Sequence, residues 1–229
     1  MIIVYAGTRN LYKAMLPSIR SLFAHNHPEK VYLMIEDDEF PYELPEECEC
    51  INVSGQKYFL PNGANADSVF TYMAMMRVTY AYLFPQHDKV LQLDVDTIIC
   101  DDLTQLWETD IEGKWFAACP EYKGYYNPWR NDKYYNIGVC LYNLKQMRED
   151  NPMPKMIKLL HCVKLCCVEQ DTLNFFGVPD KCVDIPVRYN ESFCCGQTDN
   201  PAIVHYAGYP DWYTNEDMPR REYLLKWMQ

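Results

Sequence analysis

Short, continuously apolar runs alternate with segments of helical periodicity along the chain. Three of these runs, "MIIVYAG" (1–7), "KVYLMIED" (30–37) and "KVLQL" (89–93), are typical of strands that are buried on both faces of a sheet. Helices between such strands connect parallel neighbours and cover both faces. The sequence therefore predicts an α/β, Rossmann-like fold with a mostly parallel mixed sheet flanked by helices.

The remaining elements follow from apolar periodicity and from capping residues. Further strands are expected over 50–54, 114–119, 134–144 and 202–208, and helices over 10–26, 67–84, 101–108, 151–161, 168–176 and about 217–229. Asp67 or Ser68 is expected to cap the 67–84 helix, Pro85 to end it, and Gly177 to cap the helix over 168–176. Because the sequence has neither an internal repeat nor a linker, residues 1–229 are expected to form a single domain.

The net charge of −11 argues against nucleic acid as a partner, because phosphate contacts need clustered Lys and Arg. An acidic protein that binds a phosphorylated substrate needs a local positive charge, which a divalent metal supplies. No apolar run approaches the length of a membrane span. The tail "RREYLLKWMQ" (220–229) is expected to dock onto the sheet, so membrane association is weak at most.

The 11 cysteines include two adjacent pairs, Cys166–Cys167 and Cys194–Cys195, but no C-x-x-C zinc spacing. The beginning of the sequence lacks the pattern of a signal peptide, so a secreted disulfide framework is not expected. We expect reduced cysteines, mostly packed in the core of a cytoplasmic protein.

Two aspartates, Asp94 and Asp96, follow the strand over 89–93 and are separated only by Val95. In an open α/β sheet, ligands bind beyond the carboxyl ends of the strands. Two carboxylates at that position suit Mg²⁺ or Mn²⁺, and such ions bridge naturally to a diphosphate. The plainer alternative is one capping and one solvated aspartate, because D-x-D alone is a common pattern.

His205 is the candidate third ligand, because it follows the apolar strand residues "AIV" (202–204). A neutral imidazole beside two carboxylates is an ordinary Mn²⁺ ligand set, and both strand ends are expected at the same rim of the sheet. An isolated histidine would more often be a satisfied core residue. The other histidines, expected in surface turns or at a helix end, are His25, His27, His87 and His161.

Four motifs occur in a fixed order along the chain. They are "LQLDVDTIICDDL" (91–103), "YYNIGVCLYNLKQMRE" (134–149), "EQDTLN" (169–174) and "HYAGYPDWY" (205–213). With them the chain, from residue 2 to about residue 213, resembles the family 8 retaining glycosyltransferases of the GT-A fold, a group that includes glycogenin and bacterial lipopolysaccharide galactosyltransferases. The resemblance implies a Mn²⁺-dependent hexosyltransferase with a UDP-sugar as donor.

The resemblance also implies the ligand sets. Asp94, Asp96 and His205 would hold Mn²⁺ (or Mg²⁺) against the diphosphate of the UDP-sugar. The implied donor-binding residues are Ala6, Thr8, Asn10, Tyr12 as a stacking ring, Arg77, Val95 and Gly208. Arg77 is the only charged residue in "VFTYMAMMRVTYAY" (69–82); it is either a solvated helix charge or, if buried, in need of a carboxylate or phosphate partner.

The catalytic residues that the resemblance implies surround the donor sugar. Gln170 would lie beneath the anomeric carbon and Asp171 would hold sugar hydroxyls, with Glu169 in the same motif. Asn136 would face the sugar from its strand, and Glu121 is a looser match to an acidic residue near the sugar. By residue type alone, a strand-edge amide and three helix-capping or dipole-paired side chains would explain these positions equally well.

One motif departs from the family pattern. The family has H-x-x-G-x-x-K-x-W, with the lysine neutralising the diphosphate, whereas Pro210 or Asp211 occupies the lysine position here. A missing positive charge removes electrostatic stabilisation of the leaving group. Arg188, Arg220 and Lys226 are the candidates to replace it.

The expected reaction is transfer of glucose or galactose from UDP with retained configuration, in which the leaving phosphate takes the acceptor's proton. The acceptor stays open among glycans, glycolipids and proteins, because loops 54–66 and 119–135 carry no readable code. Two alternatives are a nucleotide-sugar binding protein with weak or no turnover and a glycogenin-like self-glycosylating protein. The second is suggested by a group of tyrosines: Tyr122, Tyr125, Tyr126, Tyr134 and Tyr135.

Overall fold

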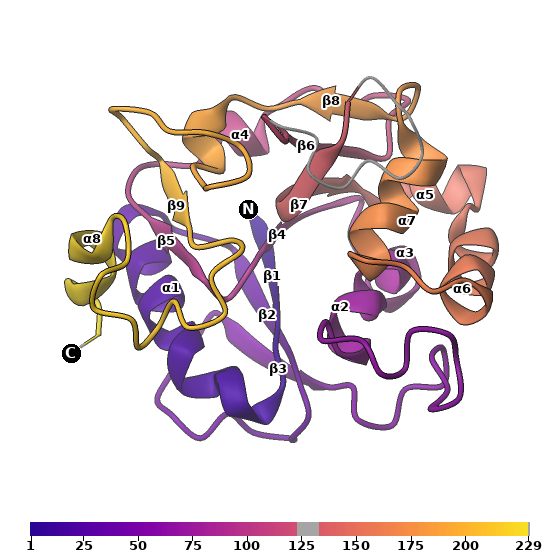
Figure 1. The fold of residues 1–229 in the computed structure, drawn as a ribbon, viewed down its shortest axis with the longest axis horizontal. Coiled ribbons are helices and arrows are strands. Elements are labelled where there is room, and N and C mark those ends of the chain that lie inside the picture. The colour runs from indigo at the N-terminus through magenta and orange to yellow at the C-terminus, as the bar shows by residue number, and fades with distance from the viewer. Residues whose placement is uncertain (123–132, 229) are drawn as a thin grey trace.

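The computed structural model describes residues 1–122 and 133–228 (Figure 1). Its strands are β1 (Ile2–Ala6), β2 (Lys30–Ile35), β3 (Cys48–Asn52), β4 (Lys89–Leu93), β5 (Thr97–Ile99), β6 (Phe116–Pro120), β7 (Tyr135–Asn143), β8 (Cys182–Asp184) and β9 (Ile203–His205). Its α-helices are α1 (Tyr12–His25), α2 (Tyr72–Met75), α3 (Tyr80–Leu83), α4 (Thr104–Trp107), α5 (Leu144–Asp150), α6 (Met153–Cys162), α7 (Val168–Gly177) and α8 (Arg221–Leu225). Three 3₁₀ turns complete it: η1 (Arg9–Leu11), η2 (Met76–Thr79) and η3 (Val187–Tyr189).

The main sheet has seven strands in the order β3-β2-β1-β4-β7-β6-β8. The pairs β1–β2, β2–β3, β1–β4 and β6–β8 are parallel, whereas β7 runs antiparallel to both of its neighbours, β4 and β6. This arrangement confirms the predicted mostly parallel mixed sheet.

Both faces of the sheet are covered by helices, as the continuous apolar runs predict. Ile3 and Tyr5 of β1 belong to an apolar cluster with Met15 and Ile19 of α1. Val4 points to the other face, into a cluster that α2, α3, α5, α6 and α7 help to form. Figure 1 shows α1 on one side of β1 and β4 and this larger group of helices on the other.

A second, two-stranded sheet forms from β5 and β9, which pair antiparallel. Ile98 and Val204 of this sheet pack with Tyr206, Met218 and Leu224, so the C-terminal segment with α8 docks here. The last predicted strand, 202–208, is therefore shorter than expected and does not join the main sheet.

The predicted continuous helix over 67–84 is wrong. The helix begins only at Tyr72, after Thr71, whose hydroxyl accepts a hydrogen bond from the Met73 amide (3.3 Å). Ser68 instead accepts from the Phe70 amide (3.2 Å), which makes a local turn, an alternative that Ser and Asp side chains commonly offer. The 3₁₀ turn η2 then separates α2 from α3.

Other boundaries also differ from the prediction. The helix expected from Asn10 begins at Tyr12, because Asn10 lies in η1 and accepts from the Thr8 hydroxyl (2.6 Å). Gly177 is the last residue of α7 and not a cap beyond it. Three elements, β5, β8 and α5, were not predicted, and the terminal helix is confined to Arg221–Leu225.

All 11 cysteines are free thiols in the structure. Four of them are buried, namely Cys119, Cys140, Cys182 and Cys195. Within residues 1–122 and 133–228, no helix combines the length and the apolar character needed to cross a bilayer.

Asn65 connects the loop before α2 to the end of α6, and its side chain is almost fully buried. Its amide donates to the carbonyls of Leu160 (2.6 Å) and Val163 (2.8 Å) and accepts from the Leu165 N–H (2.9 Å). We predict that Asn65→Ala lowers the free energy of unfolding by about 3 kcal/mol, because three buried backbone groups lose their partner. Urea unfolding measures this loss, and exposed Asn62→Ala is the control. Equal stability of the two variants would contradict the prediction.

Candidate active site

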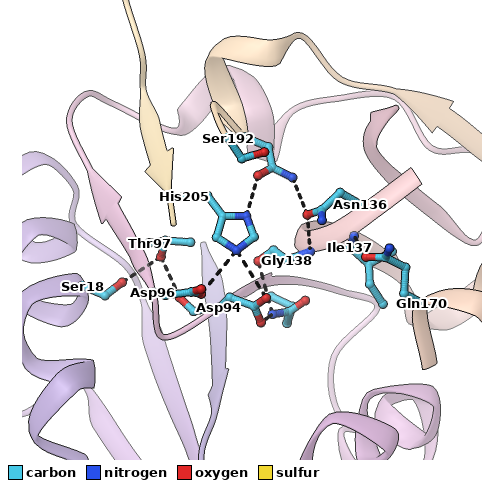
Figure 2. Close-up of polar contacts among 12 residues, drawn as sticks. Ser18, Asp94, Asp96, Thr97, Asn136, Ile137, Gly138, Gln170, Ser192 and His205 are labelled. Carbon is cyan, nitrogen blue, oxygen red and sulfur yellow. Dashed lines mark hydrogen bonds and ion pairs between the residues drawn. The ribbon is translucent and has the colours of Figure 1, made fainter. Parts of the chain in front are cut away.

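The turn after β4 sets the direction of the two aspartates. The Asp94 N–H donates to the Gly138 carbonyl of β7 (2.7 Å), and the Asp94 carbonyl accepts from the Thr97 hydroxyl (2.7 Å). That hydroxyl is bonded in turn to Ser18 of α1 (2.9 Å). These contacts fix the backbone over 94–97, so that both carboxylates face the same space (Figure 2).

The pairing of β5 with β9 brings His205 to this turn. Thr97 and His205 are partners in the ladder, and the Tyr206 N–H donates to the Asp96 carbonyl (2.9 Å). His205 Nε2 lies 3.6 Å from Asp94 Oδ2 and 3.3 Å from Asp96 Oδ1 (Figure 2). One possible ligand atom from each of the three side chains lies within 4.8 Å of the others. The expected metal-binding residues thus come together as a potential divalent-metal site.

Gly138 provides the space for this cluster. A Cβ atom at this position would lie 2.1 Å from His205 Cε1 and 2.7 Å from Asp94 Oδ2. No side chain other than hydrogen fits without displacement of these two groups. The glycine of the "YNIGV" strand is therefore a requirement of the site's geometry, in a central and otherwise fully buried strand.

Asn190, which the sequence analysis did not single out, contacts the other side of His205. Its Oδ1 lies 2.7 Å from His205 Nδ1, and its Nδ2 donates to Asn136 Oδ1 (2.9 Å). Asn136 Oδ1 also accepts from the Gly138 N–H (3.1 Å). The residue follows η3 in an irregular segment without any motif, so only its complete burial reveals it.

The charges of the cluster depend strongly on each other. Burial raises the pKa of Asp94 above its usual value, against the effect of Arg77 and with that of Asp96. For Asp96, burial also acts to raise the pKa, but the neighbouring His205 outweighs it and leaves the pKa lowered. Burial acts to lower the pKa of His205, yet the two carboxylates raise it overall. Without a cation, the imidazole is therefore the main partner of Asp96.

Arg77 is buried and forms ion pairs with two carboxylates, Asp94 and Glu169, the latter at 3.1 Å. This outcome matches the expectation that a buried Arg77 needs such partners. Gln92 also donates to Asp94 Oδ1 (3.0 Å). Glu169 Oε2 has no hydrogen-bond partner among the described residues, and burial raises the pKa of Glu169 to about 7 despite Arg77.

Gln170 lies between the strand and the loop that border the site. Its Oε1 accepts from the Ile137 N–H (3.2 Å), and its Nε2 donates to Glu121 Oε1 (3.1 Å). Asp171, which the resemblance assigns to the sugar hydroxyls, has internal hydrogen-bond donors in the structure. It is fully buried, and its two oxygens accept from the Tyr134 hydroxyl (2.6 Å) and the Cys167 N–H (2.9 Å), so its geometry is that of an anchor for the start of α7.

A cavity of about 540 Å³ opens beside the two aspartates. Its lining includes every expected donor-binding residue except Tyr12, namely Ala6, Thr8, Asn10, Arg77, Val95 and Gly208, together with Asp94 and Asp96. Among the described residues that line it, Arg77 alone carries a positive charge. The Tyr12 hydroxyl donates to Asp37 (3.0 Å) and its ring packs against Phe40, outside the cavity wall.

The candidate replacements for the missing lysine are used elsewhere. Arg188 pairs with Asp101 (2.7 Å), Arg220 pairs with Glu191 (2.7 Å), and Lys226 lies over the ring of the tryptophan that follows it. None of the three lines the cavity. At the lysine position, Pro210 lines the cavity, while Asp211 is exposed and accepts from Asn215 (3.0 Å).

The tyrosines that suggested self-glycosylation are not equivalent. Tyr134 and Tyr135 are buried, with their hydroxyls donating to Asp171 and Asp184 (2.6 Å each), so neither is placed to accept a sugar. Tyr122 is 78% exposed. Tyr125 and Tyr126 lie outside the described residues.

The profile of the family described as Glycosyl transferase family 8 matches residues 2–212. The chain belongs to glycosyltransferase family 8. Among curated proteins it is similar to the glycosyltransferase GlyA of Streptococcus pneumoniae, at 24% identity over 98% of the chain and 34% of GlyA. It is also similar to general stress protein A of Bacillus subtilis, at 24% identity over 61% of the chain and 58% of that protein.

Solved structures share the fold of this family 8 chain. The galactosyltransferase LgtC, solved with donor and acceptor sugar analogues, has a TM-score of 0.72 at 19% identity, with 100% of this chain and 95% of LgtC covered. GlyE of S. pneumoniae has a TM-score of 0.72 at 22% identity, with 99% and 59% covered. The fold is therefore the GT-A glycosyltransferase fold. The chain spans about a third of the length of GlyA and less of GlyD.

The raised pKa of Glu169 predicts a pH dependence of stability. The carboxyl of the unfolded chain, with its ordinary pKa of 4.5, loses its proton before the folded one, whose pKa is about 7. The contribution of Glu169 is therefore fully present below about pH 4.5 and is lost as pH rises through 7. Relative to Glu169→Gln, the metal-free wild-type protein should lose about 3 kcal/mol of unfolding free energy across this range.

Urea unfolding of both proteins in EDTA, at several pH values, measures this difference. Glu149→Gln, an exposed position on α5, is the control for the loss of a carboxylate. A difference between wild type and Glu169→Gln that does not change with pH would show that Arg77 offsets burial and leaves the pKa of folded Glu169 at its ordinary value.

Gly138→Ala tests the space around the ligand cluster. The added methyl group must displace the His205 ring or Asp94, so we predict at least tenfold weaker binding of Mn²⁺, measured by electron paramagnetic resonance titration. Gly55→Ala is the matched control, because a Cβ atom at that position would have no heavy atom within 4 Å. Wild-type affinity in a folded Gly138→Ala protein would contradict the geometry.

Proposed function

We propose that this family 8 glycosyltransferase is a divalent-metal-dependent, retaining hexosyltransferase. It would move glucose or galactose from a UDP-sugar to a glycan, glycolipid or protein acceptor. The observation that carries the proposal is the cluster of Asp94, Asp96 and His205, whose two carboxylates line a cavity that the turn after β1 also lines. Metal ligands and a nucleotide-sized space adjoin each other there.

The donor set fits a divalent cation. Asp94 and Asp96 offer hard oxygens. His205 offers its Nε2, because its other ring nitrogen, Nδ1, is already bonded to Asn190. This mixed set favours Mn²⁺ over Mg²⁺, which prefers oxygen ligands. When bound, the ion would act as a Lewis acid on the leaving diphosphate.

The charge balance of the cavity supports the same proposal. A nucleoside diphosphate adds negative charge to a wall that already holds Asp94 and Asp96, and Arg77 is shared between Asp94 and Glu169. The lysine of the family motif is replaced, and its candidate substitutes are paired elsewhere. We therefore expect donor binding to depend on added metal more strongly than on any side chain.

Gln170 and Asn136 do not line the cavity themselves, and we propose that their amides orient the donor sugar next to the metal cluster. The two carboxylates next to Gln170 in sequence already have partners. Glu169 forms an ion pair with Arg77, and Asp171 accepts hydrogen bonds from the Tyr134 hydroxyl and the Cys167 N–H. Because both carboxylates already have these partners, we do not propose that either forms a covalent glycosyl–carboxylate intermediate. We propose same-face attack, in which the leaving phosphate accepts the proton of the acceptor hydroxyl.

Two solved structures of one relative, LgtC, support the choice of substrate and residues. LgtC is described as a galactosyltransferase in complex with donor and acceptor sugar analogues, and a second LgtC structure as an active-site mutant with glutamine changed to glutamate. Gln170 is our candidate for an active-site glutamine in this chain. The acceptor, and the expected location in the cytoplasm, stay predictions, because longer relatives carry segments that this chain does not span.

The deciding experiment is UDP release from UDP-glucose and UDP-galactose, with Mn²⁺ or with EDTA, for wild type and Asp96→Asn. We predict Mn²⁺-dependent release from one of the two sugars and at least a 100-fold loss in Asp96→Asn, the effect expected when a stabiliser of the leaving group is removed. Isothermal titration of UDP in the same buffers serves as the binding control.

The outcomes separate the alternatives. Mn²⁺-dependent UDP binding without release, even when mono- and disaccharide acceptors are added, would favour the nucleotide-sugar binding protein. A mass increase of the protein by one or more hexose units, lost in Tyr122→Phe, would favour self-glycosylation. Absence of any UDP binding would overturn the proposed function.

A further inference from the structure

We propose that Asn190 is a positioning residue of this enzyme: it fixes the proton of His205 on Nδ1, so that Nε2 is free to bind the metal, and it couples that histidine to Asn136 beside the donor sugar. The proposal rests on the proposed function, because it concerns the same metal. It assigns a task to a residue that belongs to none of the sequence motifs.

The first step is a chain of hydrogen bonds whose direction is set by one backbone group. The Gly138 N–H can only donate, so the Asn136 side-chain atom that it contacts at 3.1 Å is the oxygen. That oxygen is also the partner of Asn190 at 2.9 Å, so Asn190 presents its amide nitrogen to it. The other end of the Asn190 amide, its oxygen, therefore faces His205 Nδ1 at 2.7 Å.

The second step follows from what an amide oxygen can do. It accepts and cannot donate, so Nδ1 of a neutral His205 carries the proton and Nε2 carries the lone pair. Nε2 is the atom that faces Asp94 and Asp96, as the dashed lines of Figure 2 show. The opposite tautomer would set the Nδ1 lone pair against the Asn190 oxygen at 2.7 Å, whereas the Nδ1–H form sets the Nε2 lone pair toward the carboxylates at the longer distances of 3.6 and 3.3 Å, where the cation would bind.

Burial excludes water as a substitute partner for the three side chains in this hydrogen-bond chain. Asn190 has no exposed surface, and Asn136 and His205 are 7% and 4% exposed. Water therefore cannot replace a missing amide contact at low free-energy cost. A buried partner on the second nitrogen is the usual way in which proteins orient a metal-binding histidine.

The third step is the rigidity of the Asn190 backbone relative to His205. The Asn190 N–H donates to the Val187 carbonyl (2.8 Å), and the next residue, Glu191, bonds to β9 on both sides, at Ile203 (3.0 Å) and at the His205 N–H (2.8 Å). Asn190 and His205 thus lie on adjacent, mutually bonded segments. Any shift of one is passed to the other.

Two arginines anchor this segment on either side of Asn190. Arg188 pairs with Asp101, and Arg220 pairs with buried Glu191 and donates to the Thr198 carbonyl (2.8 Å). These arginines were candidates to replace the missing lysine at the diphosphate. The structure assigns them instead to the scaffold that holds Asn190.

The amide of Asn190 also links the metal cluster to the sugar side of the site. Asn136 is the residue before Ile137, whose N–H donates to Gln170 Oε1 (3.2 Å). Loss of the Asn190 amide therefore removes one hydrogen bond from His205 and one from Asn136, which keeps its bond from the Gly138 N–H. Removal of only its N–H₂ group removes the bond to Asn136 and leaves the acceptor for His205 in place.

This difference defines two variants. Asn190→Ala removes both contacts, whereas Asn190→Asp keeps an acceptor toward Nδ1–H and loses the donor toward Asn136. Exposed Asn200→Ala in the same segment is the matched control. Thermal unfolding of each variant shows first that it is folded.

The first measurement is the ¹⁵N–¹H spectrum of the His205 imidazole in the metal-free protein, at alkaline pH where the ring is neutral. We expect the Nδ1–H form in wild type, Asn200→Ala and Asn190→Asp, and a shift toward the Nε2–H form in Asn190→Ala. An Nε2–H form in wild type, or an unchanged spectrum in Asn190→Ala, would overturn the proposal without bearing on the transferase activity.

The second measurement is the affinity for Mn²⁺, by paramagnetic resonance titration. We expect a 10- to 100-fold loss in Asn190→Ala and less than about a threefold change in Asn190→Asp. We also expect Asn190→Asp to raise the KM for the UDP-sugar through Asn136. Equal Mn²⁺ affinity of wild type and Asn190→Ala would overturn the positioning role. Wild-type protein that shows Nδ1–H but binds no Mn²⁺ would instead overturn the proposed metal-dependent function, and with it the metal-directed role.

Discussion

The burial of negative charge around one guanidinium is the constraint on which the rest of the site depends. Asp94, Asp96 and Glu169 lie within a space that Arg77 and His205 must balance, and Arg77 already contacts two of the three carboxylates. Such a cluster is costly in a protein interior unless a further positive charge can enter. The burial that raises the pKa of Glu169 and Asp94 also makes a bound cation favourable beside these carboxylates.

Much of the metal cluster could be predicted from the sequence because its residues follow apolar strands. Asp94 and Asp96 follow β4 as expected, and the apolar run before His205 correctly marked that residue as the end of a strand. The reason for their convergence was only partly foreseen. His205 arrives through the antiparallel β5–β9 pair, and the three residues of β5 are too short a run to be recognised between the two aspartates and the acidic turn that follows.

The elements that sequence patterns did not predict depend on tertiary contacts. In the sequence, Asn190 cannot be distinguished from any other loop asparagine. Its role becomes visible only from its hydrogen bonds to His205 and Asn136. The apolar periodicity over 67–84 is real, yet the side chain of Thr71 offers its hydroxyl to the backbone and delays the helix. For Asp171, the resemblance implies contact with sugar hydroxyls, which stays a prediction. The structure adds what the motif did not show, namely that the Tyr134 hydroxyl and the Cys167 N–H each donate to one of its oxygens.

The pairing of β5 with β9 also bears on how the protein assembles. His205 stands more than one hundred residues after Asp96 in the chain, so the cluster closes a very long loop. An ion that binds all three ligands has little affinity for the unfolded chain, where the ends of that loop are far apart. A bound metal would therefore connect the turn after β4 to the end of β9. It would slow the separation of the C-terminal segment from the sheet onto which it docks.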